Sequence, residues 1–309
     1  MGLRRLALMV ALCSAVLLLS SCLARRRVIT RGRNTPTQTL LNADKQTLLK
    51  LVSTEYASIQ TINATVDMVP AIGSANKGKI TEYKDVRAYI LYRKPAEIRI
   101  IGLYPVVRNK AFDMISNGND FRLYVPAKNL FIKGPTEVVT PSPNKLENLR
   151  PSVFLDALLV KPVNLAGEFA VLEDFTDEDN AAYIVHVLSK GEDGDLHLSR
   201  DIWFDRLSLH IVRQILFDPQ GEILTDARYN DWKTYDNVPF PRIIDINRPK
   251  DEYGVVITVV KMDINKPVGQ DKFVLEQPEG TVLHVLGTKP AEQPAPADPP
   301  AVSRKKQKK

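Results

Sequence analysis

The chain has 309 residues, of which 44% are hydrophobic, and it carries a formal net charge of +6. The first 33 residues contain seven arginines and no acidic residue, and the last 21 carry a net +4, so the residues between them carry −5. Because the basic charge lies in the two ends of the chain, composition argues against a nucleic-acid-binding domain. The two cysteines, Cys13 and Cys22, lie near the N-terminus, so an internal disulfide cannot stabilise the rest of the chain.

The N-terminus has the pattern of an export signal. Arg4 and Arg5 precede an apolar run from Leu6 to Leu19, which is too short to span a bilayer comfortably. The run leads into Leu19-Ser20-Ser21-Cys22, which resembles the lipobox of bacterial lipoproteins. That resemblance implies a lipoprotein signal peptide over residues 1–21 and lipidation of Cys22. The alternative is an ordinary secretory signal that happens to end in cysteine.

Both ends of the chain are expected to lie outside the folded domain. Residues 22–40 predict a flexible basic tether, whose arginines either add about 1 kcal/mol each of attraction to an anionic membrane or belong to a solvated spacer. Leu23, not Asp, follows Cys22; by the sorting rule of lipoprotein relatives, this implies the periplasmic face of the outer membrane in a Gram-negative cell. Residues 289–309 are rich in Pro, Ala and Lys and predict a disordered tail.

The remaining residues, 41–288, predict one mainly β domain of the α+β class. Asn42 is a candidate cap for a helix whose apolar residues recur at helical spacing, and Pro151 begins a second, short apolar helix. From Thr61 onward the apolar period is mostly two, with turn residues between the runs. We therefore expect a single strongly curved antiparallel sheet, or an open, incomplete β-barrel of about eleven strands, with a few short helices as a lid.

No motif in the chain predicts catalysis, a cofactor or a metal site. Gly73 to Lys79 has P-loop spacing, but Ile80 replaces the hydroxyl residue and a strand follows, which favours a hairpin turn. The four histidines lack metal-ligand spacing, and no activated nucleophile is evident. The acidic residues from Asp174 to Asp179 lack the order of a calcium loop.

Two regions resemble the LolA/LolB family of lipoprotein carriers and receptors. The first combines Asp201 to Asp205, which reads DIWFD, with the hairpin from Phe217 to Gly221; the second runs from Lys94 to Pro126. The resemblance covers roughly residues 44–264. It implies an open barrel around a hydrophobic cavity for acyl chains, and Cys22 makes the chain similar to the lipidated, LolB-like receptor. The implied partners are lipid acyl chains or lipoproteins, a membrane reached through the lipid anchor, and a periplasmic carrier protein.

The residues expected to contact an acyl chain are apolar positions on predicted strands. Such residues either fill a core completely or leave a cavity, in which burial gains about 25 cal/mol per Å² of apolar surface. The cavity candidates are Ile98, Ile100, Phe112, Met114, Leu123, Val125, Trp203 and Phe217.

The loop after residue 102 is apolar where a loop is usually polar, and Pro105 prevents regular strand pairing there. In receptor-like family members the corresponding connection projects a hydrophobic residue toward the membrane. We expect the same role here, and the alternative is a loop folded back onto the core. The candidate residues are Leu103, Tyr104, Val106 and Val107.

These observations predict a membrane-anchored lipoprotein that binds acyl chains and accepts or inserts lipoproteins or lipids at the outer membrane. One alternative is a lipid-sensing regulatory lipoprotein of the same fold that acts through a protein partner. An anchored enzyme with an unrecognised active site is the other.

Overall fold

The structure is a computed structural model that describes residues 39–74, 78–136, 151–177 and 180–286. The predicted signal peptide, Cys22, nearly all of the predicted tether, and the predicted C-terminal tail lie outside these residues. No helix within the described ranges is long and apolar enough to cross a membrane.

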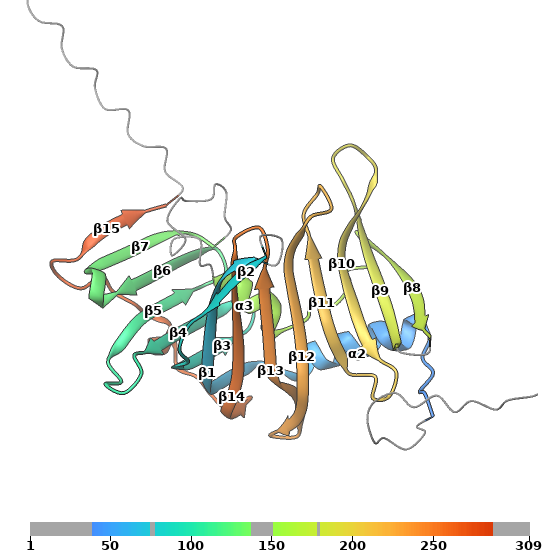
Figure 1. Ribbon diagram of the computed structural model, residues 1–309, viewed down its shortest axis with the longest axis horizontal. Coiled ribbons are helices and arrows are strands. Elements are labelled where there is room, and N and C mark those ends of the chain that lie inside the picture. The colour runs from blue at the N-terminus through green and yellow to red at the C-terminus, as the bar shows by residue number, and fades with distance from the viewer. Residues whose placement is uncertain (1–38, 75–77, 137–150, 178–179, 287–309) are drawn as a thin grey trace, which may run out of the picture.

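Fifteen strands form one sheet, shown in Figure 1. Fourteen follow the order β15-β7-β6-β5-β4-β3-β1-β14-β13-β12-β11-β10-β9-β8, and β2 pairs with β1. Neighbouring strands are antiparallel, except that β15 runs parallel to β7. The strands are β1 (Thr61–Ser74), β2 (Lys79–Glu82), β3 (Val86–Arg93), β4 (Glu97–Leu103), β5 (Lys110–Ser116), β6 (Asp120–Val125), β7 (Leu130–Pro135), β8 (Glu168–Thr176), β9 (Ala181–Lys190), β10 (Leu196–Asp205), β11 (Ile211–Phe217), β12 (Ile223–Tyr235), β13 (Val238–Arg248), β14 (Tyr253–Ile264) and β15 (Val282–Val285).

The long strand β1 joins the two halves of the sheet. On one side it pairs with β14, from Ile62 opposite Ile264 to Ile72 opposite Tyr253, and on the other side it pairs with β3. The first strand therefore lies next to a strand almost 200 residues later in the chain. This long-range pairing makes the two runs of consecutive hairpins a single sheet.

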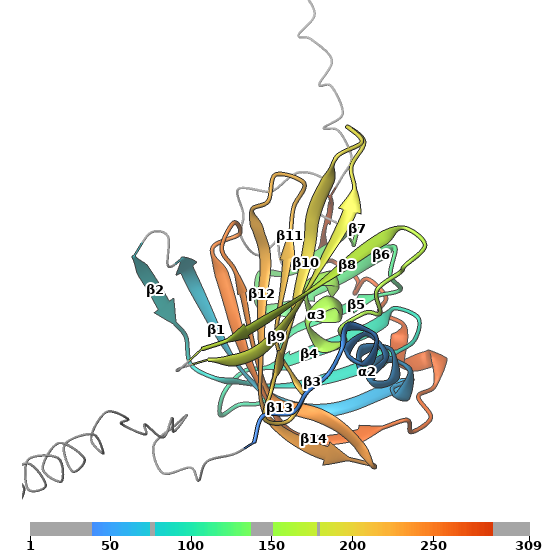
Figure 2. The ribbon, with the colours of Figure 1, turned by 90° about the vertical axis from the view of Figure 1, so that its right-hand side faces the viewer.

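Two α-helices, α2 (Lys45–Ser58) and α3 (Pro151–Leu158), lie on the same face of the sheet, which we call the helix face (Figure 2). Two short 3-10 helices, η3 (Pro126–Lys128) and η5 (Gln270–Phe273), lie in connections. The residue that caps α2 is Asp44, not Asn42 as expected: the Asp44 carboxylate accepts a hydrogen bond from the backbone N–H of Thr47 at 2.8 Å. Asn42 instead accepts a hydrogen bond from the Arg206 guanidinium.

The main hydrophobic core lies between the helix face and the two helices. Leu48 and Val52 of α2 and Phe154 of α3 pack against alternate residues of the strands. A second, smaller cluster of Ile115, Phe131 and Leu275 lies apart from this core. Ile115 follows the core residue Met114 along β5, so this cluster lies on the opposite face, which we call the outer face.

The expected fold class is confirmed as mainly β, but the expected curvature and strand number are wrong. The sheet is not strongly curled. It is also not closed, because its end strands β8 and β15 do not pair with each other. The described residues form fifteen strands rather than about eleven. The extra strands include β2, which is exposed along its whole length, and β15, which joins the sheet through one parallel neighbour. Neither strand has the buried face that an alternating sequence reveals.

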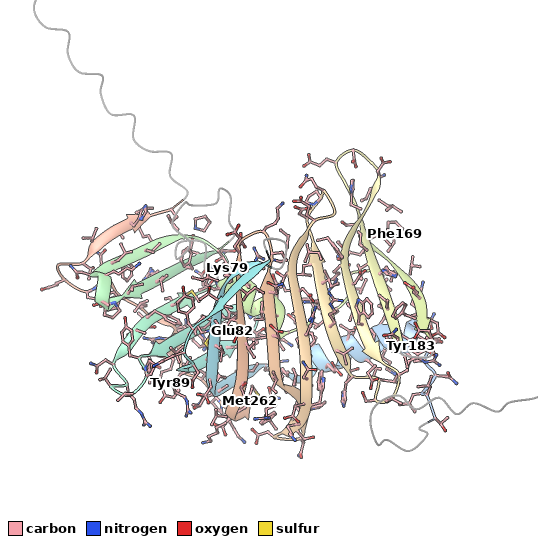
Figure 3. The ribbon with its side chains drawn as sticks, in the orientation of Figure 1. Lys79, Glu82, Tyr89, Phe169, Tyr183 and Met262 are labelled. Atoms are coloured by element: carbon pink, nitrogen blue, oxygen red, sulfur yellow. The ribbon has the colours of Figure 1, made fainter. Side chains whose placement is uncertain are left out.

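The glycines with P-loop spacing belong to a β-hairpin, as the sequence predicted. Gly73 lies opposite Ile80, and a Cβ at Gly73 would come within 2.1 Å of the backbone oxygen of Lys79. Figure 3 labels the two ends of β2, Lys79 and Glu82, beside the C-terminal part of β1. The spacing therefore serves a tight strand pairing and not a phosphate site.

Candidate functional site

An apolar hollow of about 250 Å³ opens at the ends of the central strands, where β1 extends past the start of β3. Its walls come from β1, β3, β5, α3 and β14, with no charged side chain among them. The lining residues are Met68, Pro70, Ala71, Ile72, Val86, Phe112, Phe154, Tyr253, Gly254 and Val255.

The hollow forms because β3 begins opposite Met68, whereas β1 continues to Ile72 and beyond. Pro70 lies where this change occurs. Its carbonyl accepts a hydrogen bond from the N–H of Tyr83, so the position where proline lacks an N–H faces the side that β3 no longer covers. A proline is therefore compatible with this central strand, and it marks the place where the ladder to β3 ends.

Phe112 and Gly102 shape the wall of the hollow near β5. The two residues lie opposite each other on β5 and β4, and the Phe112 ring lies against the glycine. A Cβ at Gly102 would be 2.2 Å from a carbon of that ring. Glycine at this position therefore keeps the ring against β4 and out of the space beyond it.

The volume of the hollow limits what it can hold. A protein cavity of about 150 Å³ accommodates benzene, so about 250 Å³ has room for roughly ten carbon atoms. Because the lining is apolar, the occupant that suits it is a hydrocarbon group. The available space fits the end of one acyl chain and is smaller than the two or three long chains of a complete lipoprotein anchor.

The β4–β5 loop, residues 104–109, lies at the same ends of the strands as the hollow, because β4 ends beside the start of β3. Val106 is 97% exposed and Val107 is 64% exposed, while Tyr104 is also exposed and Leu103 is half-buried at the end of β4. The N–H of Tyr104 donates to the carbonyl of Asn109 at 2.8 Å, which closes the loop. Val106 has φ of 68°, a left-handed conformation that is unfavourable for a β-branched residue. A strained and fully exposed valine makes this loop unlike an ordinary surface turn.

A buried ionic cluster fixes the two strands that carry the loop. The side chain of Asp113 is fully buried on the outer face. It pairs with Arg99 of β4 at 2.8 Å and with Lys110, at the start of β5, at 2.6 Å. Arg99 also donates to the carbonyl of Lys272, which lies in η5. These contacts hold the base of the loop against the C-terminal segment.

The structure divides the predicted cavity residues into three groups. Ile98, Ile100, Met114, Leu123 and Val125 are buried in the main core. They lie in packed core, which is one of the two alternatives that the sequence left open, and they do not line the hollow. Phe112, by contrast, lines it.

The third group, Trp203 and Phe217, does not line the hollow. Trp203 is on the outer face, because its neighbours Ile202 and Phe204 point into the main core. Its ring packs edge-on against Phe175 at 5.6 Å between centroids. Phe217 lines a polar depression between the β9–β10 and β11–β12 turns. Alternation gave the spacing of these residues but not the face to which they belong.

Several lining residues had not been expected, including those of β1, α3 and β14. The sequence held one signal for them, which is Pro70 inside an otherwise regular strand pattern. No group of three His, Cys, Asp or Glu side chains suited to a metal ion occurs within the described ranges.

Comparisons with known proteins found similarity in structure only. No protein-family model matches the chain, and no curated protein matches it in sequence. A LolA superfamily protein from Nitrosomonas europaea is 12% identical, with a TM-score of 0.47, and the alignment covers 74% of this chain and 97% of that one. A DUF1329 family protein from Desulfovibrio piger is 13% identical, with a TM-score of 0.48 and coverages of 74% and 94%.

A third similar structure is a Vibrio parahaemolyticus domain described as an outer membrane lipoprotein-sorting protein. It is 10% identical, with a TM-score of 0.47, and the alignment covers 73% of this chain and 94% of that one. At these identities and scores the similarities carry no functional argument. The chain therefore has structural similarity, at low sequence identity, to LolA superfamily and lipoprotein-sorting domains.

Proposed function

We propose that this protein is a membrane-anchored lipoprotein that binds the end of an acyl chain in its apolar hollow and accepts or inserts lipids or lipoproteins. The observation that carries the proposal is an uncharged hollow of about 250 Å³ that opens at the same sheet edge as the exposed Val106 and Val107. Lipidation of Cys22 and location at the outer membrane belong to the proposal and rest on the sequence resemblance.

The size of the hollow favours transient binding. Burying roughly ten methylene groups at about 0.8 kcal/mol each contributes about 8 kcal/mol. Association costs at least about 4 kcal/mol, so the net affinity is expected to be weaker than micromolar. Such an affinity suits a passive handover between binding sites, in which no bond is made or broken.

The β4–β5 loop is assigned the contact with the membrane. Its exposed valines can enter the interfacial region of a bilayer, while the buried cluster around Asp113 keeps the strands below them in place. An acyl chain leaving the bilayer would then meet the hollow at the same edge of the protein.

A variant that fills the hollow tests the binding site. Val86→Trp adds an indole ring to its wall, and we expect at least tenfold weaker binding of a fluorescent fatty acid because the ring occupies the same volume. The matched control is Val171→Trp, at an exposed position of β8 far from the hollow. Unchanged fatty-acid affinity in a folded Val86→Trp protein would contradict the proposed site.

The loop is tested by the double variant Val106→Glu and Val107→Glu. We expect this variant to retain fatty-acid binding but to lose lipid transfer between vesicles, because charged side chains oppose insertion. Leu196→Glu is the control, since Leu196 is 54% exposed and begins β10 at the same edge. Equal transfer by the loop variant and the wild type would count against this role of the loop.

A lipid-sensing role is the second candidate, and the limited volume of the hollow favours it, because sensing requires only one chain end. The same transfer measurement separates the two functions. Fatty-acid binding without any transfer by the wild-type protein, together with a stoichiometric protein partner, would support sensing.

A further inference from the structure

The strand β8 is one of the two end strands of the sheet, and it lacks the features that usually keep such an edge from pairing (Figure 1). The other end strand, β15, has only four residues, whereas β8 has nine. β8 contains no proline and no lysine, and its register with β9 is continuous, without a bulge. Natural sheets use these devices against pairing with another chain, so their absence makes β8 a candidate for such pairing.

The backbone of Ala170 shows which groups of β8 point to its free side. The Ala170 carbonyl accepts a hydrogen bond from the ammonium group of Lys45 at 3.0 Å. The partner of Ala170 on β9, Val187, directs its own carbonyl toward β10, where it accepts from the Ser199 hydroxyl at 2.8 Å. Ala170 and Val187 therefore form a non-hydrogen-bonded pair, in which the N–H and C=O of Ala170 point away from β9.

Leu172 and Asp174 also turn their backbone groups to the free side, because the direction alternates along a strand. The side chains of Ala170 and Leu172 pack against the main core, so those of Phe169 and Val171 lie on the outer face. Phe169 is 55% exposed and Val171 is 53% exposed. The free edge therefore offers backbone donors and acceptors next to exposed apolar side chains, which is the combination that strand addition requires.

Each of the three acidic side chains of β8 is held by a basic group of the same chain. The pairs are Glu168 with Arg200 at 3.3 Å, Glu173 with His186 at 2.8 Å and Asp174 with Arg206 at 3.0 Å. Carboxylates lie at both ring nitrogens of His186, at 2.7 and 2.8 Å, so the charged imidazolium is the favoured form. Charge repulsion, which is another protection of edge strands, is therefore weakened along β8.

We propose that β8 pairs with β8 of a second copy of this chain, antiparallel and centred on Leu172. Leu172 is the middle residue of the strand, so only this centre pairs all nine residues. It also brings outward-facing backbone groups together, Leu172 with Leu172 and Ala170 with Asp174 of the second copy. A two-fold axis through Leu172 makes the contact self-complementary and closed, so the product is a dimer and not a fibre.

The order of side chains along β8 suits this register. Phe169 falls opposite Phe175 of the second copy on the outer face, and aromatic pairs of this kind stabilise antiparallel strands. Asp174 falls opposite Ala170 of the second copy, the residue whose carbonyl is contacted by the Lys45 ammonium group. The register therefore brings a cation, and not another anion, toward Asp174.

Neighbouring registers are opposed by charge. If the centre moves to Val171, Glu168 falls opposite Asp174 of the second copy. If the centre moves to Glu173, this carboxylate falls opposite its own copy. Like charges directly opposite each other destabilise an antiparallel pair. The acidic side chains therefore permit the pairing and select its register.

This pairing has a consequence for the apolar hollow, although the dimer does not depend on the proposed function. The hollow lies at one end of the central strands, and antiparallel copies run in opposite directions. The two hollows of a dimer therefore open toward opposite ends, and only one of them can face a given bilayer.

Sedimentation equilibrium of the purified full-length chain, in a detergent of matched density, tests the dimer. We expect the average mass to rise with protein concentration toward that of two chains. Ala170→Pro should weaken association at least about tenfold, because proline removes an N–H that faces the free side and places its ring there. The β8–β9 ladder does not use this N–H, so the strand itself should tolerate the proline. Ala170→Val keeps the N–H and is the matched control, which should associate like the wild type.

A wild-type protein that stays a single chain at every concentration would overturn the proposal. Equal association of the wild type and a folded Ala170→Pro protein would also overturn it, because association through another part of the chain survives this substitution. Circular dichroism shows whether Ala170→Pro is folded. Fatty-acid binding in the apolar hollow should be unchanged in this variant, so failure of the dimer is distinguishable from failure of the proposed function.

The register is tested by disulfide formation between two variants, each made in a Cys13→Ser, Cys22→Ser background. Val171→Cys and Glu173→Cys should cross-link when mixed, because the two positions face each other in a non-hydrogen-bonded pair, at about 4.5 Å between Cα atoms. Each variant alone should cross-link much less, since its two copies are displaced by two residues along the strands. Equal cross-linking in the mixture and in both single samples would overturn a pairing centred on Leu172.

Discussion

The raised pKa of the Glu55 carboxyl leads to a quantitative prediction about the free energy of unfolding. Its carboxyl lies in an apolar pocket without a partner among the described residues, so the folded protein favours the neutral, protonated form. The perturbation is Glu55→Gln, which gives a side chain of the same shape that cannot ionise. We expect this substitution to remove one component of the pH dependence of the free energy of unfolding.

The sign and size follow from the pKa of Glu55, which is raised from 4.5 to about 7. The folded state binds this proton more tightly than the unfolded state, so the stabilisation is fully present below about pH 4.5. It is lost as the pH rises toward 7. Each pKa unit corresponds to about 1.36 kcal/mol, so the wild type should lose about 3 kcal/mol relative to Glu55→Gln across this range.

Urea unfolding of both proteins at several pH values between about 4 and 8 measures this difference. Groups that remain in both proteins cancel in the comparison. His210, which stacks on Trp232 and has its pKa lowered by burial, is one of them. Glu276→Gln, at an exposed position, is the control and should follow the wild-type curve. If the unfolding free energies of wild type and Glu55→Gln differ by the same amount at every pH, the assignment of a raised pKa to Glu55 is wrong.

Two further predictions concern the strands that carry the exposed loop. Asp113→Asn leaves Arg99 and Lys110 against a neutral amide, so the free energy of unfolding in urea should fall by about 3–5 kcal/mol. A fall of less than about 1 kcal/mol would contradict a buried ionic cluster. Gly102→Ala should push the Phe112 ring toward the hollow and weaken fatty-acid binding, with a stability cost of about 1–3 kcal/mol; unchanged binding would mean that the ring relaxes elsewhere.

Much of the local structure could be predicted because it depends on near neighbours in the chain. Period-two alternation identified most strands, and a proline followed by an apolar run identified α3. The cap of α2 was assigned two residues too early, because Asn42 and Asp44 are both acceptable capping residues. The contact between Arg206 and Asn42, which comes from a distant part of the chain, distinguishes them.

The candidate site was predicted less completely, since its walls come from distant segments. The exposure of Val106 and Val107 agrees with an apolar loop interrupted by proline, although their role at a membrane stays a prediction. For Ile98 and Ile100 the sequence left open whether they fill a core or line a cavity, and in the structure they lie in packed core. A strand sequence tells which residues share a face, but it does not tell whether another element covers that face.

The sequence by itself determined the class of the fold, the positions of most strands and the apolar character of the β4–β5 loop, because these follow from backbone preference and local alternation. Only the tertiary structure decided that β1 pairs with β14 and that the hollow lies where β1 extends past the start of β3. The tertiary structure also decided that Trp203 lies on the face opposite the main core. It also decided that Glu55 lies beside largely apolar residues of α3, β11, β12 and β13. These features depend on which distant segments meet, and a contact between distant segments leaves no periodic pattern in either one.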